Sequence, residues 1–179
     1  TTTIIGAPGD TFPLTAAATP TGIGPNVVIA SDNTLGSFSS YQGRLYVSYV
    51  NRLPTGNDNP ADNTDIYLVT SDNGGLSWSA PRIVNDDFAL TDGFSEGLGG
   101  AGVGFPGVTA SSGRPQFQPN VVVDQATGSL VMSWYDTRYD AARARVATFM
   151  TASIDGGSSF SPDVFANAAL APTDEITGQ

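Results

Sequence analysis

The residues of this chain that could do chemistry are acids and arginines, because the sequence contains no cysteine, histidine or lysine. Their absence excludes a Ser-His-Asp triad, a cysteine nucleophile and a zinc site built from histidine or cysteine. What remains is carboxylate, hydroxyl, tyrosine and arginine chemistry, together with the binding of hard cations by oxygen ligands.

One set of charged residues is predicted to gather at a single end of the fold and to bind a ligand. A guanidinium group binds a carboxylate through two parallel hydrogen bonds, so arginines among acids are typical of a site for an acidic ligand. The alternative is a structural loop in which Arg138 pairs with Asp136 or Asp140. The candidate ligand-binding residues are Arg52, Arg114, Asp136, Arg138 and Asp140.

A second set of oxygen ligands lies in residues 57–65, where clustered aspartates could bind Ca²⁺. The spacing and the central glycine of an EF-hand loop are missing, and a solvated turn is the alternative. The candidate metal ligands are Asp58, Asp62 and Asp65; a weaker candidate group is Asp86, Asp87, Asp92 and Glu96.

The elements that must position these residues form two repeats, since three sequence blocks occur twice in the same order. The first block is Pro-Asn-Val-Val, at Pro25–Ile29 and Pro119–Val123. The second is Gly-x-Leu-x-x-Ser-aromatic, at Gly43–Tyr49 and Gly128–Trp134. The third is a turn sequence, at Thr70–Trp78 and Ser153–Phe160.

The segments between these blocks are predicted to be short β-strands, because they are rich in β-branched and aromatic residues and are bounded by Gly, Pro, Asn and Asp. Four antiparallel strands per repeat make up one blade of a β-propeller. The predicted strands are 27–30, 45–50, 66–70 and 82–84 in the first repeat, and 121–123, 130–135, 146–151 and 164–166 in the second.

The repeats divide the chain into five parts. An N-terminal extended segment covers residues 1–24, and blade one covers residues 25–86. A glycine-rich connection covers residues 87–118, blade two covers residues 119–167, and residues 168–179 lead toward a next blade.

The third block resembles the Asp-box, or bacterial neuraminidase repeat, Ser/Thr-x-Asp-x-Gly-x-Ser/Thr-Trp/Phe. The copy at Ser153–Phe160 fits without gaps, whereas the copy at Thr70–Trp78 carries one extra residue. The aspartates Asp72 and Asp155 are expected to accept hydrogen bonds from backbone N–H groups of the turn. The matching residues are Thr70, Asp72, Gly74 and Trp78 in the first copy and Ser153, Asp155, Gly157 and Phe160 in the second.

This resemblance covers nearly all of the chain after residue 24 and implies two blades of a sialidase-like, six-bladed propeller. It also extends to the repeat regions of large secreted bacterial proteins, so an extracellular or cell-surface location is expected. In the family the box marks the fold and lies away from the active site, so its residues are predicted to be structural.

Two functions follow as expectations. The favoured one is a non-catalytic structural or ligand-binding propeller segment of a large extracellular or cell-surface protein. The alternative is part of a sialidase-like glycoside hydrolase, exo-acting on sialylated or related acidic glycans. No Arg-Ile-Pro-type motif is present and no Tyr–Glu pair can be assigned, so no catalytic residue is predicted.

The expected partners are other blades of the parent chain or identical copies, with a glycan as the candidate ligand. Two blades alone leave two faces uncovered, which favours a fragment over a ring of three copies. The net charge of −10 argues against nucleic acid as a partner, and no apolar stretch is long enough for a membrane span.

Overall fold

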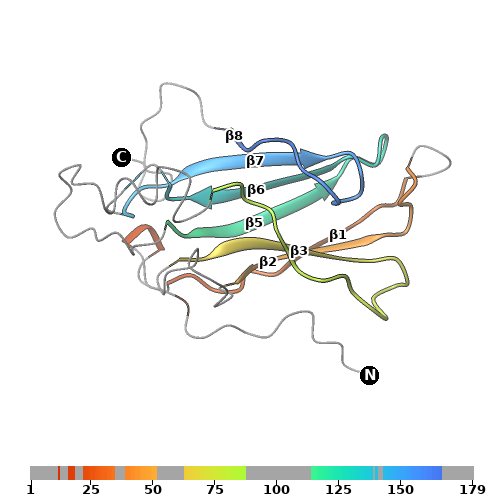
Figure 1. The fold of residues 1–179 in the computed structure, drawn as a ribbon, viewed down its shortest axis with the longest axis horizontal. Helices are drawn as coiled ribbons and strands as arrows, with labels where there is room; N and C mark the ends of the chain where they lie inside the picture. Colours follow the sequence, from red (N-terminus) through yellow and green to blue (C-terminus); the bar gives the residue numbers. More distant parts are fainter. Residues whose placement is uncertain are drawn as a thin grey trace.

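The computed structural model describes residues 12, 16–18, 22–34, 39–51, 63–87, 114–138, 140 and 143–166. In this part of the chain the protein is all-β. Two four-stranded antiparallel sheets lie against each other, and the only helical element described is a single 3-10 turn, η1 (Ala16–Ala18) (Figure 1). The predicted fold class is therefore confirmed at the level of two four-stranded sheets.

Each sheet is an antiparallel meander with its strands in sequence order, which is the strand order of a propeller blade. All eight predicted strand segments overlap a strand of the structure. The first sheet contains β1 (Val28–Ser31), β2 (Leu45–Asn51), β3 (Asp65–Ser71) and β4 (Arg82–Ile83). The second contains β5 (Gln116–Val123), β6 (Leu130–Asp136), β7 (Ala147–Ser153) and β8 (Val164–Phe165).

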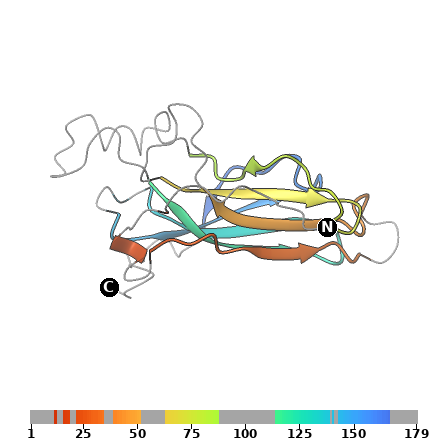
Figure 2. The same cartoon turned by 90° about the horizontal axis from the view of Figure 1, so that it is seen from below.

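The pairing register shows which residues of the two sheets are equivalent. Leu45 pairs with Ser71 in the first sheet and Leu130 pairs with Ser153 in the second, so the second and third sequence blocks coincide in space. The strands of both sheets run close to the long axis of the molecule (Figure 2).

The first sequence block does not coincide in the same way. Val28 lies opposite Ser48, whereas Asn120 lies opposite Ser133, the equivalent of Ser48. The Pro-Asn-Val-Val match would instead make Val122 the equivalent of Val28. A register irregularity between Phe117 and Asn120 accompanies this displacement.

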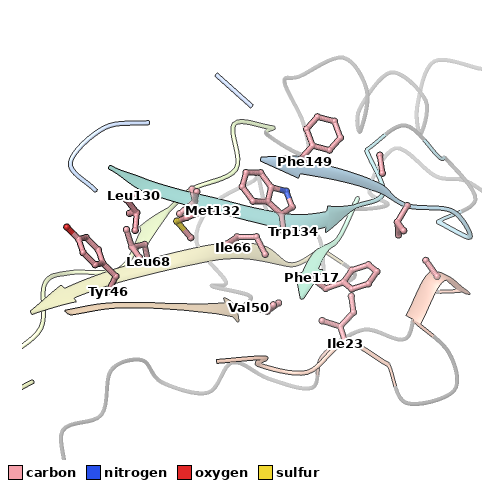
Figure 3. Packing of buried hydrophobic residues seen from close by; sticks show 14 of the residues in the cluster. Ile23, Tyr46, Val50, Ile66, Leu68, Phe117, Leu130, Met132, Trp134 and Phe149 are labelled. Atoms are coloured by element: carbon pink, nitrogen blue, oxygen red, sulfur yellow. The ribbon is translucent and has the colours of Figure 1, made fainter. Parts of the chain in front are cut away.

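The hydrophobic core lies mainly between the two sheets (Figure 3). Side chains alternate between the faces of a strand, so every second residue of β2, β3, β6 and β7 reaches this core. Trp134 lies over Ile66 in the centre of the cluster (Figure 3). The facing residues are Tyr46, Val50, Ile66 and Leu68 from the first sheet and Leu130, Met132, Trp134 and Phe149 from the second.

The opposite face of the first sheet carries a smaller cluster of Val47, Tyr49, Tyr67 and Val69, against which Trp78 packs. The rings of Tyr49 and Tyr67 stack with their centroids 5.8 Å apart. The described part of the chain contains no helix with the length and hydropathy needed to cross a membrane.

Candidate functional site

A network of one arginine and four aspartates joins the two sheets, and it is buried except for the Asp86 side chain, which is 48% exposed. Arg138 donates from Nη1 to Asp86 Oδ1 at 2.7 Å and from Nε to Asp136 Oδ2 at 2.8 Å. Its Nη2 donates to Asp87 Oδ1 at 3.2 Å and to Asp163 Oδ2 at 2.9 Å. Two of the acids follow β4 in the first sheet, and the others end β6 or precede β8 in the second, so a single cation links both sheets.

Two buried amide side chains extend the network. The Gln116 amide donates from Nε2 to Asp87 Oδ2 at 2.8 Å and to Asp136 Oδ1 at 3.3 Å. The Asn85 amide donates from Nδ2 to Asp65 Oδ1 at 3.1 Å and to Asp87 Oδ1 at 2.9 Å. Neutral donors therefore reach three carboxylate oxygens that the Arg138 guanidinium does not: Oδ2 of Asp87, Oδ1 of Asp136 and Oδ1 of Asp65.

The carboxyl groups of this network differ in how readily they ionise. Burial raises the pKa of Asp65 to about 6, against the opposing hydrogen bond from Asn85. Burial and a hydrogen bond with the Asp86 carboxyl raise the pKa of Asp163 to about 7. Burial and the charge of a neighbouring aspartate raise the pKa of Asp87 well above its usual range. Carboxyl groups in this range can hold a proton near neutral pH, as a general acid does.

Asp86 shows the opposite shift. Burial would raise its pKa, but hydrogen bonds from Asp163 and Arg138 outweigh that effect and lower it. The two carboxyl groups are therefore shifted in opposite directions, and Asp163 loses its proton less readily than Asp86. Burial tends to lower the pKa of Arg138, yet Asp136 and Asp87 raise it overall, so the guanidinium stays charged.

The Arg138 guanidinium is enclosed by protein groups. Arg138 is 6% exposed, and its Cζ lies 4.2 Å from the centre of the Phe149 ring. The hydrogen bonds of the guanidinium described above are all with the chain's own carboxylates. The pairing with Asp136 matches the structural alternative stated for this loop. The other suggested partner, Asp140, lies elsewhere: it accepts hydrogen bonds from two backbone N–H groups and is 3.5 Å from Arg145.

Of the other candidate residues, the structure describes Arg114 and Asp65. Arg114 is fully buried, and its backbone carbonyl accepts a hydrogen bond from Gln116. Asp65 is a buried residue at the start of β3. Arg52, Asp58, Asp62, Asp92 and Glu96 lie outside the described residues. Within the described residues, no group of three or more acidic side chains is arranged to hold a metal ion.

The turn before β8 is held by its aspartate. Asp155 Oδ1 accepts the backbone N–H of Ser159 at 2.8 Å and the hydroxyl of Ser153 at 2.8 Å. The Ser159 side chain and backbone N–H lower the pKa of Asp155 to about 2. Gly156 and Gly157 have positive φ angles, which a glycine adopts without strain.

The turn before β4 has the same hydrogen bonds but not the predicted residue. Asn73 Oδ1 accepts the backbone N–H of Ser77 at 2.9 Å and the hydroxyl of Ser71 at 3.0 Å. The prediction for Asp72 is thus corrected, because Asn73 holds the place that Asp155 has in the second turn. The match in space is Ser71–Trp78, which aligns with Ser153–Phe160 without an extra residue.

Asp72 instead belongs to a bridge between the two turns. Arg44 donates from Nε and Nη2 to the Asp72 carboxylate at 2.6 and 2.7 Å, and from Nη1 to the carbonyl of Gly156 at 2.8 Å. The Arg82 guanidinium also donates to the carbonyl of Ser158. Two arginines therefore connect the turn before β4 with the turn before β8.

A hollow of about 500 Å³ opens between β1 and the second sheet. Two residues at its rim, Asn26 and Gln118, have positive φ angles of 41° and 52°, which is uncommon outside glycine. Among the described residues, no charged side chain lines it. Its lining residues are Asn26, Val27, Val28, Gln118, Pro119, Asn120, Ser133, Trp134, Tyr135 and Thr148.

Three important residues of these arrangements were not predicted from the sequence. Asp163 sits far from Arg138 in sequence and carries no local motif. Asn73 was missed because the neighbouring Asp72 matches the aspartate of the Asp-box pattern, whereas Asn73 does not. Of the three, only Arg44 could have been noticed in the sequence, because it lies within the repeated Gly-x-Leu block next to a turn.

Comparisons with known proteins find similarity only among solved structures. No family model matches the sequence, and no curated protein matches it. The Hadza microbial sialidase Hz136 is 17% identical, with a TM-score of 0.47 over 68% of this chain and 23% of the sialidase.

The GH93 α-L-arabinofuranosidase of Fusarium graminearum, solved with arabinobiose, is 16% identical, with a TM-score of 0.49 over 87% of this chain and 34% of that enzyme. The same arabinofuranosidase with an iminosugar inhibitor gives a TM-score of 0.48 at 16% identity, over 88% of this chain and 35% of the enzyme. This chain therefore spans about a third or less of the length of the enzymes named above.

Proposed function

We propose that this chain is a non-catalytic pair of blades from a sialidase-like, six-bladed propeller, with a structural or ligand-binding role in a large extracellular or cell-surface protein. Two meanders with equivalent turns support the blade assignment. The repeated turn bonds of Asn73 and Asp155 support the Asp-box assignment. A glycan is the candidate ligand class.

The observation that carries the non-catalytic assignment is the state of Arg138. An arginine that receives a ligand carboxylate must offer its N–H groups to that ligand. Arg138 is buried, and its side-chain N–H groups donate to four protein carboxylates, so that the network joins the two sheets. One of the candidate ligand-binding arginines is therefore engaged in an internal ion-pair network.

The test is an assay of the full chain with fluorogenic sialoside and α-L-arabinofuranoside substrates. The expected result is no turnover above buffer, with circular dichroism showing that the same sample is folded β-sheet. Turnover that disappears in an Asp163→Asn variant, while the fold is retained, would overturn the proposal.

The alternative function is part of a sialidase-like glycoside hydrolase. The raised pKa values of Asp65 and Asp163 favour it, because a glycosidase needs a carboxyl group that stays protonated near its working pH. On this alternative the substrate would be a sialylated or related acidic glycan. A pH–rate profile whose alkaline limb lies near pH 6 to 7 would support it over the favoured function, because activity is lost when that carboxyl group loses its proton.

A further inference from the structure

Asn73 and Gly74 form the only Asn-Gly pair in the sequence, and they lie in the exposed turn before β4. Every other asparagine is followed by a residue that carries a side chain. Asparagine is chemically labile, because the backbone nitrogen of the next residue can attack its side-chain amide. A following glycine presents that nitrogen without a Cβ beside it. In this chain the attack is therefore least hindered at Asn73.

The backbone nitrogen of Gly74 is open to react. Apart from its own chain neighbours, no atom lies within 4 Å of the position that a Gly74 Cβ would occupy. The N–H groups of Asn73 and Gly75 both donate to Ser71 Oγ, at 3.4 and 2.9 Å. Within the described residues the Gly74 N–H has no such acceptor, so no hydrogen bond has to break before it reacts.

The side-chain amide of Asn73 is held in a way that favours attack on its carbon. Its Oδ1 accepts the backbone N–H of Ser77 at 2.9 Å and the hydroxyl of Ser71 at 3.0 Å. Two donors aimed at a carbonyl oxygen stabilise the negative charge that it gains when a nucleophile adds. The Ser77 hydroxyl lies 2.7 Å from Asn73 Nδ2, close enough to deliver a proton to the leaving nitrogen.

The second turn has the same backbone arrangement but resists this reaction for two reasons. Asp155 stands where Asn73 stands, and its pKa is lowered to about 2, so it is an ionised carboxylate that repels a nucleophile. Gly156 is also crowded: a Cβ there would lie 2.6 Å from the Tyr41 ring and 2.7 Å from Arg44 Nη1. Arg44 also donates to the Gly156 carbonyl at 2.8 Å.

The second turn also shows that an aspartate fits at position 73. Asp155 Oδ1 accepts a backbone N–H and a serine hydroxyl, as Asn73 Oδ1 does. Asp155 Oδ2 accepts the hydroxyl of Ser159 at 2.5 Å, whereas Asn73 Nδ2 donates to the equivalent hydroxyl of Ser77. Because a serine hydroxyl can both accept and donate, Ser77 needs only to rotate its proton to bind a carboxylate.

We propose that Asn73 is a site of spontaneous deamidation in the folded protein, and that its aspartate product gives the first turn the acceptor that Asp155 provides in the second. A base in solution removes the Gly74 N–H proton, and the nitrogen attacks Cγ of Asn73 to form a C–N bond. The bond from Cγ to Nδ2 breaks, and Nδ2 takes up a proton and leaves as ammonia. A succinimide ring remains. This modification is independent of the function proposed above.

Water then opens the succinimide ring. Cleavage of the bond between the Gly74 nitrogen and Cγ leaves aspartate at position 73 and restores the original backbone. Cleavage at the backbone carbonyl carbon leaves isoaspartate, whose extra main-chain carbon would displace Gly75 and Ser77 from their present hydrogen bonds. The folded turn therefore favours aspartate. The net reaction consumes water, releases ammonia and adds one negative charge to the net charge of −10.

Incubation of the folded chain in mildly alkaline buffer tests the proposal, with the urea-unfolded chain as the positive control. Peptide mapping by mass spectrometry measures the fraction converted at position 73, and anion-exchange chromatography detects the added charge. We expect conversion of the folded protein, mainly to aspartate, at a rate that rises with pH because attack needs the deprotonated nitrogen. An unconverted Asn73 in the folded protein, under conditions that convert it in urea, would overturn the proposal.

Asp155→Asn is the matched control, because it places a second Asn-Gly pair in a turn with the same hydrogen bonds. Gly156 is packed against Tyr41 and Arg44, so deamidation at position 155 should be at least about tenfold slower than at Asn73 in the same folded molecule. Equal rates at the two positions would overturn the role given to the open Gly74.

A pair of variants tests the donors to the amide oxygen. Ser71→Ala removes one donor to Asn73 Oδ1 and should slow deamidation at least about tenfold. Ser71→Thr keeps the hydroxyl and should keep the rate. A folded Ser71→Ala protein that deamidates as fast as the wild type would overturn the part given to Ser71.

Asn73→Asp tests the product directly. This variant should melt close to the wild-type temperature and should gain no further charge on incubation. A large fall in its melting temperature would show that the turn does not accept the aspartate, and would overturn the second half of the proposal.

Discussion

Asp86 and Asp163 hold each other by reciprocal hydrogen bonds. The backbone N–H of Asp86 donates to Asp163 Oδ2 at 2.9 Å, and the backbone N–H of Asp163 donates to Asp86 Oδ2 at 3.0 Å. One residue follows β4 of the first sheet and the other precedes β8 of the second, so the pair ties the sheets together at their outer strands. Arg138 neutralises the pair from one side.

Removing that cation should be costly. An Arg138→Met variant retains a side chain of similar length but leaves four acids without their shared partner, and a broken buried ion pair typically costs about 3–5 kcal/mol. We expect a loss of this order in the free energy of unfolding, measured by urea denaturation. Arg145→Met is the control, because Arg145 is 61% exposed and forms a pair at 3.5 Å worth about 0–1 kcal/mol. Equal losses in both variants would contradict the role given to the network.

Stability should fall as the pH rises from about 5 to about 8. The pKa of Asp163 is about 7 in the folded protein and near 4 in an unfolded chain. The folded state therefore binds the proton more tightly, and its stabilising effect is complete below about pH 4 and lost as the pH rises through 7. Asp65, with a folded pKa of about 6, adds to the same trend. Melting temperatures across this pH range measure the effect.

The control for this pH dependence is a pair of aspartate-to-asparagine variants. Asp163→Asn should flatten the profile near pH 7, because asparagine does not titrate. Asp124→Asn should leave it unchanged, since hydrogen bonds from Thr127 and Ala126 lower the pKa of Asp124 and it does not titrate in this range. A wild-type melting temperature that is flat or rises with pH would show that the Asp163 assignment is wrong.

The two turns should respond differently to loss of their aspartates. Asp155→Ala removes the acceptor for Ser159 and should cost about 1–3 kcal/mol. Asn73→Ala should behave alike, because Asn73 has the same role. Asp72→Ala should cost only about 0–1 kcal/mol, since it breaks a surface pair with Arg44.

Thermal unfolding of the three variants measures these differences. Asp155→Asn is the matched control and should stay close to wild type, because asparagine already performs this task in the first turn. If Asp72→Ala proved as damaging as Asp155→Ala, the correction from Asp72 to Asn73 would fail.

Calcium binding by residues 57–65 stays a prediction. Millimolar Ca²⁺ should raise the melting temperature, because a ligand that binds only the folded state stabilises it, and chelation should lower it. The combined variant Asp58→Asn and Asp62→Asn should lose this response, while Asp124→Asn should keep it. An unchanged melting temperature in the wild-type protein would remove the calcium hypothesis.

The strands could be predicted from the sequence because their signals are local. Short β-branched segments between turn residues gave all eight strands, and the turn at Ser153–Phe160 was readable from its own residues. The register of β5 was not, because an irregularity between Phe117 and Asn120 displaces a block whose letters still match. Two segments with matching residues are similar in composition, whereas the pairing register of a strand depends on the strand to which it is hydrogen-bonded.

The candidate site was harder to predict because its residues meet only through the packing of the two sheets. Arg138 and Asp136 are neighbours in sequence and their pairing was foreseeable as an alternative. Asp163 reaches them across the interface, and no spacing rule connects positions so distant. The choice of Asn73 over Asp72 depends on backbone geometry, which the motif letters do not encode.

The Arg44 bridge has a consequence for how relatives of this protein can vary. Its three donors reach a side chain of one turn and a backbone carbonyl of the other, and lysine has no planar fork with which to replace them. A side chain at Gly156 would begin 2.6 Å from the Tyr41 ring and 2.7 Å from Arg44 Nη1. Positions 44 and 72 should therefore covary across an alignment, and position 156 should stay glycine wherever position 44 is arginine.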